Sequence, residues 1–310
     1  FYMRVGIPNA LYFEGSNLMY KTFFNELGID VIFSGVTTNK IKEEGIRIST
    51  SESCLASKIF IGHVDSLVKR SKKENIDYIF VPRLCTYKKN ETECVKFYAM
   101  YDICKNLFDG NFITLNLDYD RGKSEITSYV ELANKLGINP LKAYIAYIKA
   151  KRVCKLEKEA TEKYFFKTNT NERKKILVVA HPYVFEDNLL GKPICNFIKS
   201  QGIGVVYASK QKMSDKYKDI TKTLYWRGSK KLVSGVLSTL GSVDGIIYIS
   251  VFPCGGDSLV TELMQRKIKN IPSISLVLDE HTNLEGYITR LESFVDIINK
   301  DTFNVIQDVM

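Results

Sequence analysis

Three cysteines of this chain stand where a thiol could do chemistry. Cys54 opens a predicted helix, Cys94 lies in the loop after a predicted strand, and Cys254 directly follows another predicted strand. A thiol at the N-terminus of a helix faces the positive end of the helix dipole, which favours the thiolate that metals bind. Their positions therefore raise the question of a metal site.

The residues after Cys254 fit one kind of metal centre in particular. Gly255 and Gly256 allow the backbone to approach a bound group closely, and their N–H groups could donate hydrogen bonds to the sulfides of an iron–sulfur cluster. The spacing alone does not single out such a site, because none of the three cysteines belongs to a C-x-x-C pair. Burial as small apolar side chains is the alternative.

The other cysteines give a different pattern. Cys104, Cys154 and Cys195 each fall inside a predicted amphipathic helix, so we expect them to be ordinary core or half-buried residues. Cys85 ends a predicted strand close to Cys94, and the sequence leaves open whether it contributes to the same site.

Four basic residues are candidates for proton transfer or ligand orientation. Lys58 and His63 follow Cys54 in the same predicted helix, while His181 and His281 each follow a predicted strand. A structural or capping role is the default for any single histidine. Ligands of parallel α/β sheets gather beyond the carboxyl ends of strands, so the positions of His181 and His281 favour a site.

The elements that must position these residues alternate between strands and helices, which predicts βαβ units, parallel sheets and an α/β fold. We expect a Rossmann-like domain over residues 3–135, a helical connection over 136–172, and a second Rossmann-like domain with a C-terminal helix over 173–310. The predicted strands are Met3 to Ile7, Asp30 to Ser34, Asp77 to Pro82, Asn111 to Leu117, Ile176 to Ala180, Gly204 to Ala208, Gly245 to Val251 and Ser273 to Leu278.

Helical periodicity fills the gaps between these strands. In the first half we expect a helix from Leu18 to Leu27 that is capped by Gly28, a short one from Lys40 that ends at Gly45, and one from Cys54 to Lys72. Later helices are expected at about 124–168, 188–200, 229–240, 259–266 and 284–298. The two halves read as two copies of one architecture.

Composition excludes several classes of protein. The chain has 310 residues, 45% of them hydrophobic, and carries a net charge of +9 in short basic runs that lack the interleaved aromatic residues of a nucleic-acid groove. No run approaches the ~18 apolar residues of a membrane helix. We therefore expect a cytoplasmic protein with neither nucleic acid nor membrane as partner, whose cysteines stay reduced. An acidic protein or an anionic cofactor such as coenzyme A would suit the charge.

Eight ordered motifs resemble one known family, the acyl-CoA dehydratase activase-related proteins, which are similar to the 2-hydroxyacyl-CoA dehydratase subunits of anaerobic bacteria. The motifs span nearly the whole chain. They are Gly6-Ile7-Pro8, Phe23 to Gly28, Glu52 to Lys58 with Gly62-His63-Val64, Tyr78 to Arg83, Cys94 to Phe97, Tyr225-Trp226, Phe252 to Ser258, and Asp279 to Thr282 continuing through Thr289 to Glu292.

The resemblance implies a cofactor and its ligands. Proteins of this kind hold a [4Fe-4S] cluster through three cysteines, which here would be Cys54, Cys94 and Cys254, meeting in the cleft between the two domains. An [8Fe-9S] double-cubane cluster is the alternative. The sequence departs from the family pattern after Cys54, where Leu55-Ala56-Ser57 replaces Phe-Pro-Ala, and after Cys94, where Val95 stands in place of proline.

Three cysteines leave one iron of such a cluster open to a small molecule. The chain has no Gly-x-x-x-x-Gly-Lys-Ser/Thr phosphate loop, so we expect a separate ATP-dependent activator to drive low-potential electron transfer. The alternatives are a reductase or dehydratase enzyme that acts on an acyl-CoA or other small substrate at the cluster, and a non-catalytic cluster carrier or regulatory module. A homo-oligomer is left open.

Overall fold

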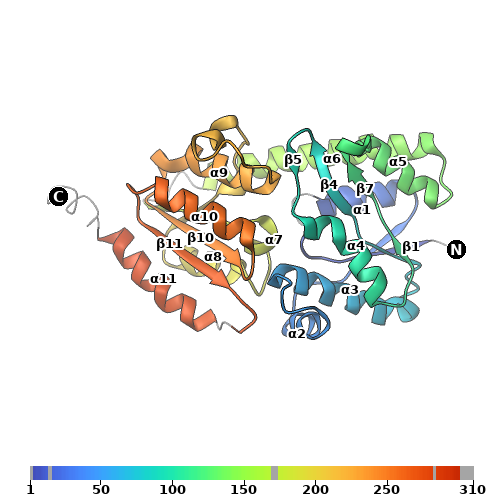
Figure 1. The fold of residues 1–310 in the computed structure, drawn as a ribbon, viewed down its shortest axis with the longest axis horizontal. Coiled ribbons are helices and arrows are strands. Elements are labelled where there is room, and N and C mark those ends of the chain that lie inside the picture. Colours follow the sequence, from blue (N-terminus) through green and yellow to red (C-terminus); the bar gives the residue numbers. More distant parts are fainter. Residues whose placement is uncertain (1–2, 13–15, 169–173, 282–283, 301–310) are drawn as a thin grey trace. The chain divides into compact units, whose positions relative to one another are not determined.

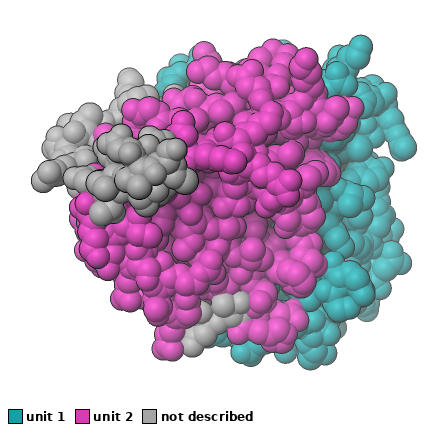
Figure 2. Space-filling model, turned by 60° about the vertical axis from the view of Figure 1, so that its left-hand side comes forward, with its two compact units in different colours: residues 1–161 teal, residues 162–310 magenta. Residues whose placement is uncertain are grey.

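The structure, a computed structural model, describes residues 3–12, 16–168, 174–281 and 284–300 (Figure 1). The chain divides into two compact units, residues 1–161 and 162–310, which Figure 2 distinguishes by colour. The division falls in helix α6 (Pro140–Thr168), inside the segment 136–172 that the sequence predicts as a connection. Among the described residues, no helix is long and apolar enough to cross a membrane.

Unit 1 is built on a parallel sheet of four strands in the order β2-β1-β3-β6. Its elements are β1 (Arg4–Ile7), α1 (Ser16–Glu26), β2 (Asp30–Phe33), α2 (Asn39–Ile48), α3 (Leu55–Glu74), β3 (Tyr78–Phe80), β4 (Arg83–Lys88), β5 (Glu91–Thr92), α4 (Val95–Leu107), β6 (Phe112–Ile113), β7 (Asn116–Asp118) and α5 (Glu125–Lys135), followed by α6.

Helices cover both faces of this sheet. Right-handed crossovers from β1 to β2 and from β2 to β3 run in opposite directions, so they place α1 on one face and α3 on the other. The first face is filled by aromatic packing, in which Phe23 of α1 meets Tyr129 of α5 with ring centroids 4.7 Å apart. On the second face α3 contacts both α2 and α4.

One predicted strand proves to be two. The apolar run from Asn111 to Leu117 divides into β6, which completes the main sheet, and β7, which pairs with β4 in a separate small sheet of order β5-β4-β7. Each piece is only two or three residues long, so one continuous apolar run can serve two sheets without a turn signal between them. The β4-β5 hairpin lies between β3 and the helix that Cys94 precedes.

Unit 2 repeats the plan with a parallel sheet of order β11-β10-β8-β9. Its helices and strands are β8 (Lys175–Val179), α7 (Pro182–Phe185), α8 (Gly191–Ser200), β9 (Gly204–Tyr207), α9 (Arg227–Thr239), β10 (Gly245–Val251), α10 (Gly255–Lys267), β11 (Ser273–Leu278) and α11 (Leu284–Asn299). Every residue of β10 is buried, as its uninterrupted apolar sequence predicts.

The two sheets have one topology. If the strands of each main sheet are numbered in chain order, both sheets read 2-1-3-4. The helix before the third strand is α3 in unit 1 and α9 in unit 2, while the helix between the third and fourth strands is α4 in unit 1 and α10 in unit 2. The prediction of two Rossmann-like α/β domains with parallel sheets is therefore confirmed at the level of fold.

Helices α2 and α3 approach each other closely through two glycines. Gly45 does not end α2, as the sequence analysis expects, but lies inside it, because its missing side chain makes room for α3. A Cβ atom at Gly45 would lie 2.0 Å from the Lys58 carbonyl oxygen, and one at Gly62 would lie 2.0 Å from the Ile41 carbonyl oxygen. Gly28, by contrast, does follow α1 with a left-handed φ of 82°.

We predict that Gly45→Ala lowers the free energy of unfolding of unit 1 by about 1–3 kcal/mol, because the added methyl group must push α3 away. The matched control is Gly110→Ala, whose new Cβ would meet the Phe112 ring at an ordinary 3.6 Å. Urea denaturation followed by circular dichroism measures both variants. Equal midpoints for Gly45→Ala and the wild type would contradict the close helix packing.

Candidate functional site

In sheets of this topology, ligands bind beyond the carboxyl ends of the strands where the strand order reverses. The reversal lies between β1 and β3 in unit 1 and between β8 and β10 in unit 2. In unit 2 the residues just past these two strands include His181 after β8 and Cys254 after β10. The chain therefore places a thiol and an imidazole at the position where this fold usually binds its ligand.

Unit 1 carries its two candidate thiols at helix N-termini. Cys54 is the N-cap residue of α3 and Cys94 is the N-cap residue of α4, and neither side chain caps its own helix. Cys94 is exposed, whereas Cys54 is partly buried and its Sγ lies 3.2 Å from the hydroxyl oxygen of Ser57. Both thiols consequently sit at the positive end of a helix dipole.

A hydrogen bond joins the starts of these two helices. The Nζ atom of Lys96, on α4, donates a hydrogen bond to the hydroxyl oxygen of Ser53, the residue before Cys54, at 3.3 Å. Ser53 is buried, and its hydroxyl also lies 3.2 Å from that of Thr50. This contact places Cys54 and Cys94 in the same region of unit 1.

Cys254 occupies the equivalent position in unit 2. It is the N-cap residue of α10, its side chain makes no capping hydrogen bond, and Gly255 and Gly256 form the first turn. A Cβ atom at Gly256 would lie 3.5 Å from the ring of Trp226, the N-cap residue of α9. The helices before and after the third strand thus touch through their first turns in both units, and Trp226 stands where unit 1 has Cys54.

A buried carboxylate links the candidate histidine of unit 2 to its candidate thiol. Asp257 accepts a hydrogen bond from His181, with 2.9 Å between Nε2 and Oδ1. Burial raises the pKa of Asp257, but the charge of His181 and the hydrogen bonds from His181 and Cys254 lower it, and the net pKa is below its usual value. Asp257 therefore orients both side chains.

The surroundings of His181 leave little space. Its ring stacks on Tyr183 with centroids 5.1 Å apart, and a Cβ atom at Gly228, in the first turn of α9, would lie 2.6 Å from Cε1. The first turns of α7, α9 and α10 therefore all border Cys254, Asp257 and His181.

His63 is held in the interior of unit 1. It is fully buried, with Nδ1 2.7 Å from the Ser34 hydroxyl and Nε2 2.9 Å from the Thr37 hydroxyl. Burial lowers its pKa to about 4. Both ring nitrogens have hydroxyl partners, so this geometry fits a neutral residue that joins α3 to the end of β2. Lys58, one turn from Cys54, is also buried.

His281 differs from the other two histidines. Its side chain is 88% exposed and pairs only loosely with Glu280, with 3.4 Å between Nε2 and Oε1. It follows β11, which is an edge strand, rather than one of the two strands that flank the reversal of strand order.

The remaining cysteines are placed as the sequence predicts, inside α4, α6 and α8. Cys104 and Cys195 are buried, and burial raises the pKa of Cys195 to about 11 and that of Cys104 further. Burial raises the pKa of Cys154 as well. Cys85 lies in β4 and its carbonyl accepts a hydrogen bond from Glu93, the neighbour of Cys94, but burial and the carboxylate of Asp118 raise its pKa. A raised pKa disfavours the metal-binding thiolate.

Sequence reasoning missed the residues that connect these candidates. Asp257, Trp226, Lys96 and Ser53 received no role, although Asp257 could have been noticed three residues after Cys254, a spacing that puts both on one side of a helical turn. Among the residues that the structure describes, no three His, Cys, Asp or Glu side chains are grouped closely enough to hold a metal ion. The three candidate thiols divide as two in unit 1 and one in unit 2.

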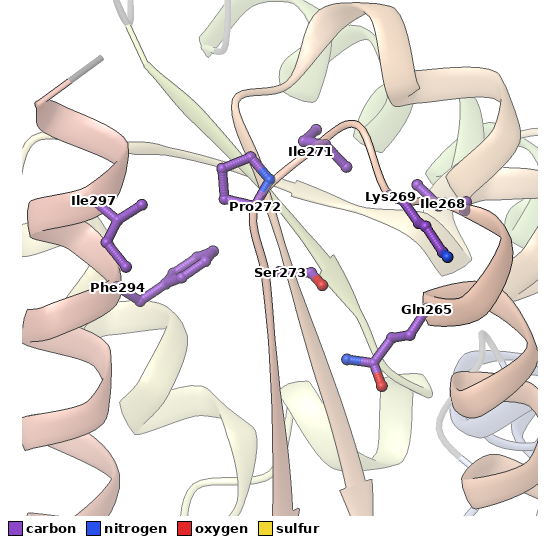
Figure 3. A pocket seen from close by; sticks show the side chains of 8 residues that line it. All are labelled: Gln265, Ile268, Lys269, Ile271, Pro272, Ser273, Phe294 and Ile297. Carbon is purple, nitrogen blue, oxygen red and sulfur yellow. The ribbon is translucent and has the colours of Figure 1, made fainter. Parts of the chain in front are cut away.

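A shallow cavity of about 330 Å³ lies elsewhere in unit 2 (Figure 3). Phe294 and Ile297 of α11 line one side, Gln265 of α10 lines another, and Pro272 and Ser273 lead into β11. Because Ser273 is the first residue of its strand, this cavity is at the amino edge of the sheet. It does not include any of the candidate residues.

The chain belongs to a family described as the CoA enzyme activase uncharacterised domain, whose model matches residues 4–210, about two thirds of the sequence. The match covers unit 1 and the part of unit 2 that carries His181. The resemblance to activase-related proteins is thereby confirmed, whereas the closer resemblance to dehydratase subunits stays a prediction. No curated protein matches the chain.

Comparison with solved structures gives only distant likenesses. A putative Asp/Glu racemase from Yersinia pestis is 11% identical, with 88% of this chain and 93% of the other covered and a TM-score of 0.25. The binding protein FpvC from Pseudomonas aeruginosa with Mn²⁺ is also 11% identical, with both chains fully covered and a TM-score of 0.31. Similarity at this level carries no inference about function.

We predict that the thiols differ sharply in reactivity. Cys94 is exposed and should react first with iodoacetamide at pH 7.5, while Cys104 and Cys195 should react only after unfolding, because burial excludes the reagent and disfavours the thiolate. Peptide mapping by mass spectrometry after timed alkylation measures each site. Labelling of Cys104 at the rate of Cys94 in the folded protein would contradict the structure.

We also predict that His63 makes stability depend on pH. The unfolded chain binds a proton to this residue below its ordinary pKa of 6.5, but the folded protein does so only near 4. The stabilisation is therefore complete above pH 6.5 and declines by about 3 kcal/mol as the pH falls to 4, at about 1.36 kcal/mol per unit of pKa difference.

Urea titrations between pH 4 and pH 7 test this dependence in the wild type and in His63→Gln. The variant should lose most of the decline, whatever its stability at pH 7. His281→Gln is the matched control, because it makes the same substitution at a histidine whose side chain is 88% exposed. Parallel pH curves for wild type and His63→Gln would show that His63 is not held neutral.

Proposed function

We propose that this chain is an iron–sulfur protein of a CoA-enzyme activation system, with Cys54, Cys94 and Cys254 as cluster ligands. The observation that carries the proposal is the shared placement of these thiols: each is the N-cap residue of a helix and none caps that helix with its side chain. Helix dipoles and free backbone N–H groups stabilise the negative charge of cysteine thiolates and cluster sulfides.

The donor set fits the proposed group. Thiolates are the ligands of iron–sulfur clusters. The proposal leaves out the four cysteines whose pKa is raised by burial, which are Cys85, Cys104, Cys154 and Cys195. Gly255 and Gly256 at the start of α10 would let backbone N–H groups approach the cluster sulfides. The [4Fe-4S] form needs only these three thiolates, and a double-cubane cluster is the alternative.

A low-potential electron-transfer role fits this ligand set. When bound, the cluster would supply one-electron transfer, and an iron without a cysteine ligand would accept a small molecule. A separate ATP-dependent activator, or the CoA enzyme that the family description implies, would be the partner. In unit 2, His181 and Asp257 would orient a ligand close to Cys254.

An enzymatic role remains the nearest alternative within this proposal. A reductase or dehydratase would act on an acyl-CoA or a small substrate, and a chain with 44 basic against 35 acidic residues would favour the phosphates of coenzyme A. A cluster carrier or regulatory module would instead need only the three thiolates.

A second candidate function follows from the family description itself: the chain would be part of the activator that hydrolyses ATP. The sequence argues against nucleotide phosphate binding, because the chain has no Gly-x-x-x-x-Gly-Lys-Ser/Thr phosphate loop and Ala180-His181-Pro182 after β8 contains no glycine. ATP binding measured by isothermal titration calorimetry distinguishes the two candidates.

Anaerobic reconstitution with iron and sulfide tests the cluster proposal. The wild type should bind about four irons and absorb near 400 nm, the expected composition and colour of one cubane cluster. Cys54→Ser, Cys94→Ser and Cys254→Ser should each lose most of the iron. Cys154→Ser and Cys85→Ser are matched controls that should retain it. Full iron content in all three ligand variants would rule out this assignment.

A further inference from the structure

We propose that Lys96 is a positioning residue that holds the first turn of α4 against the first turn of α3, so that Cys94 and Cys54 bind one group together. The inference rests on the proposed function for the identity of that group. The contact does not depend on any bound group, since it is a hydrogen bond from Lys96 Nζ to Ser53 Oγ at 3.3 Å.

The two partners are well placed for this role. Lys96 is the second residue of α4, two positions after Cys94, and Ser53 directly precedes Cys54. Ser53 is 6% exposed, and its backbone N–H donates to the Thr50 carbonyl oxygen at 3.1 Å, which holds the backbone of Ser53 in place before α3. Movement of α4 away from α3 would therefore break a hydrogen bond from a charged donor.

Tyr12 also links the two helices, because its ring packs on Phe60 of α3 and on Phe97 of α4 with centroids 5.3 and 5.1 Å apart. The hydrogen bond from Lys96 adds a polar contact at the helix starts themselves. The β4-β5 hairpin lies between β3 and α4 in the sequence, so no tight turn joins Cys94 to β3. Among the described residues of unit 2, the corresponding turns meet through the Trp226 ring against Gly256, an apolar contact in place of an ammonium group. The same junction is thus polar in the unit with two candidate ligands.

The ammonium group also suits an anionic site. A positive charge at the start of α3 would raise the reduction potential of a bound cluster, since reduction adds negative charge. The other reading is that Lys96 is an ordinary half-buried lysine whose removal changes only the local charge. The experiment must therefore separate position from charge.

Cross-linking of the metal-free protein tests position directly. Dibromobimane becomes fluorescent only when it bridges two neighbouring thiols, and peptide mapping identifies which thiols are joined. The wild type should give a Cys54–Cys94 cross-link, and Lys96→Met should give it about fivefold more slowly, the factor that a hydrogen bond of ordinary strength provides. Lys89→Met, which removes an exposed lysine of the same unit, is the matched control and should match the wild type.

Ser53→Ala removes the acceptor and keeps the charge, so it should slow cross-linking as Lys96→Met does. After reconstitution, Lys96→Met should shift the cluster's midpoint potential downward, whereas Lys96→Arg should restore it. An unchanged thermal unfolding midpoint in each variant shows that the fold is intact.

The outcomes distinguish the two proposals. If the wild type cross-links Cys54 to Cys94 and both variants slow the reaction, but no protein binds iron, then Lys96 positions the thiols and the cluster assignment fails. If the wild type binds a cluster but Lys96→Met and Ser53→Ala cross-link at the wild-type rate, or the wild type gives no Cys54–Cys94 product, the role of Lys96 is wrong.

Discussion

Two consecutive parallel strands must be joined by a crossover connection, and in this chain nearly every crossover contains a helix. Because each helix runs opposite to the strands, helix N-termini collect at the carboxyl edge of each sheet. That constraint brings Cys54, Cys94, Cys254 and His181 to helix starts. The site that we propose depends on it, because a helix start presents free backbone N–H groups and the positive end of the helix dipole to a bound anion.

The two units share one topology but carry different residues at equivalent positions. Cys94 and Cys254 hold equivalent places at the helix after the third strand, but the equivalent of Cys54 is Trp226. Unit 2 instead adds the hydrogen-bonded pair of Asp257 and His181 beside its single thiol. In the proposed site, unit 1 would supply two ligands, and unit 2 would supply the third ligand together with the pair of Asp257 and His181.

The sequence predicts the long apolar elements well and the short ones poorly. Strands β10 and β11 match their predicted bounds, because each is a mostly apolar run with a proline near one end, Pro253 after β10 and Pro272 before β11. The small β5-β4-β7 sheet was missed, since strands of two or three residues carry no readable period. Among candidate residues, the helix start at Cys54 was predicted from local sequence, but Cys94 was placed in a loop and the helix after Cys254 was expected to begin only at residue 259. The burial of His63 between Ser34 and Thr37 could not be predicted, because those partners lie more than 25 positions away.

The glycine contact between α2 and α3 has a mechanical consequence. Where Gly45 and Gly62 cross, backbone meets backbone with no side chain between to absorb a displacement. The two helices therefore pack directly against each other, and Cys54 lies at the N-terminal end of α3. The same backbone contact that fixes α2 against α3 therefore also fixes the direction in which α3 leads to Cys54, its N-cap residue.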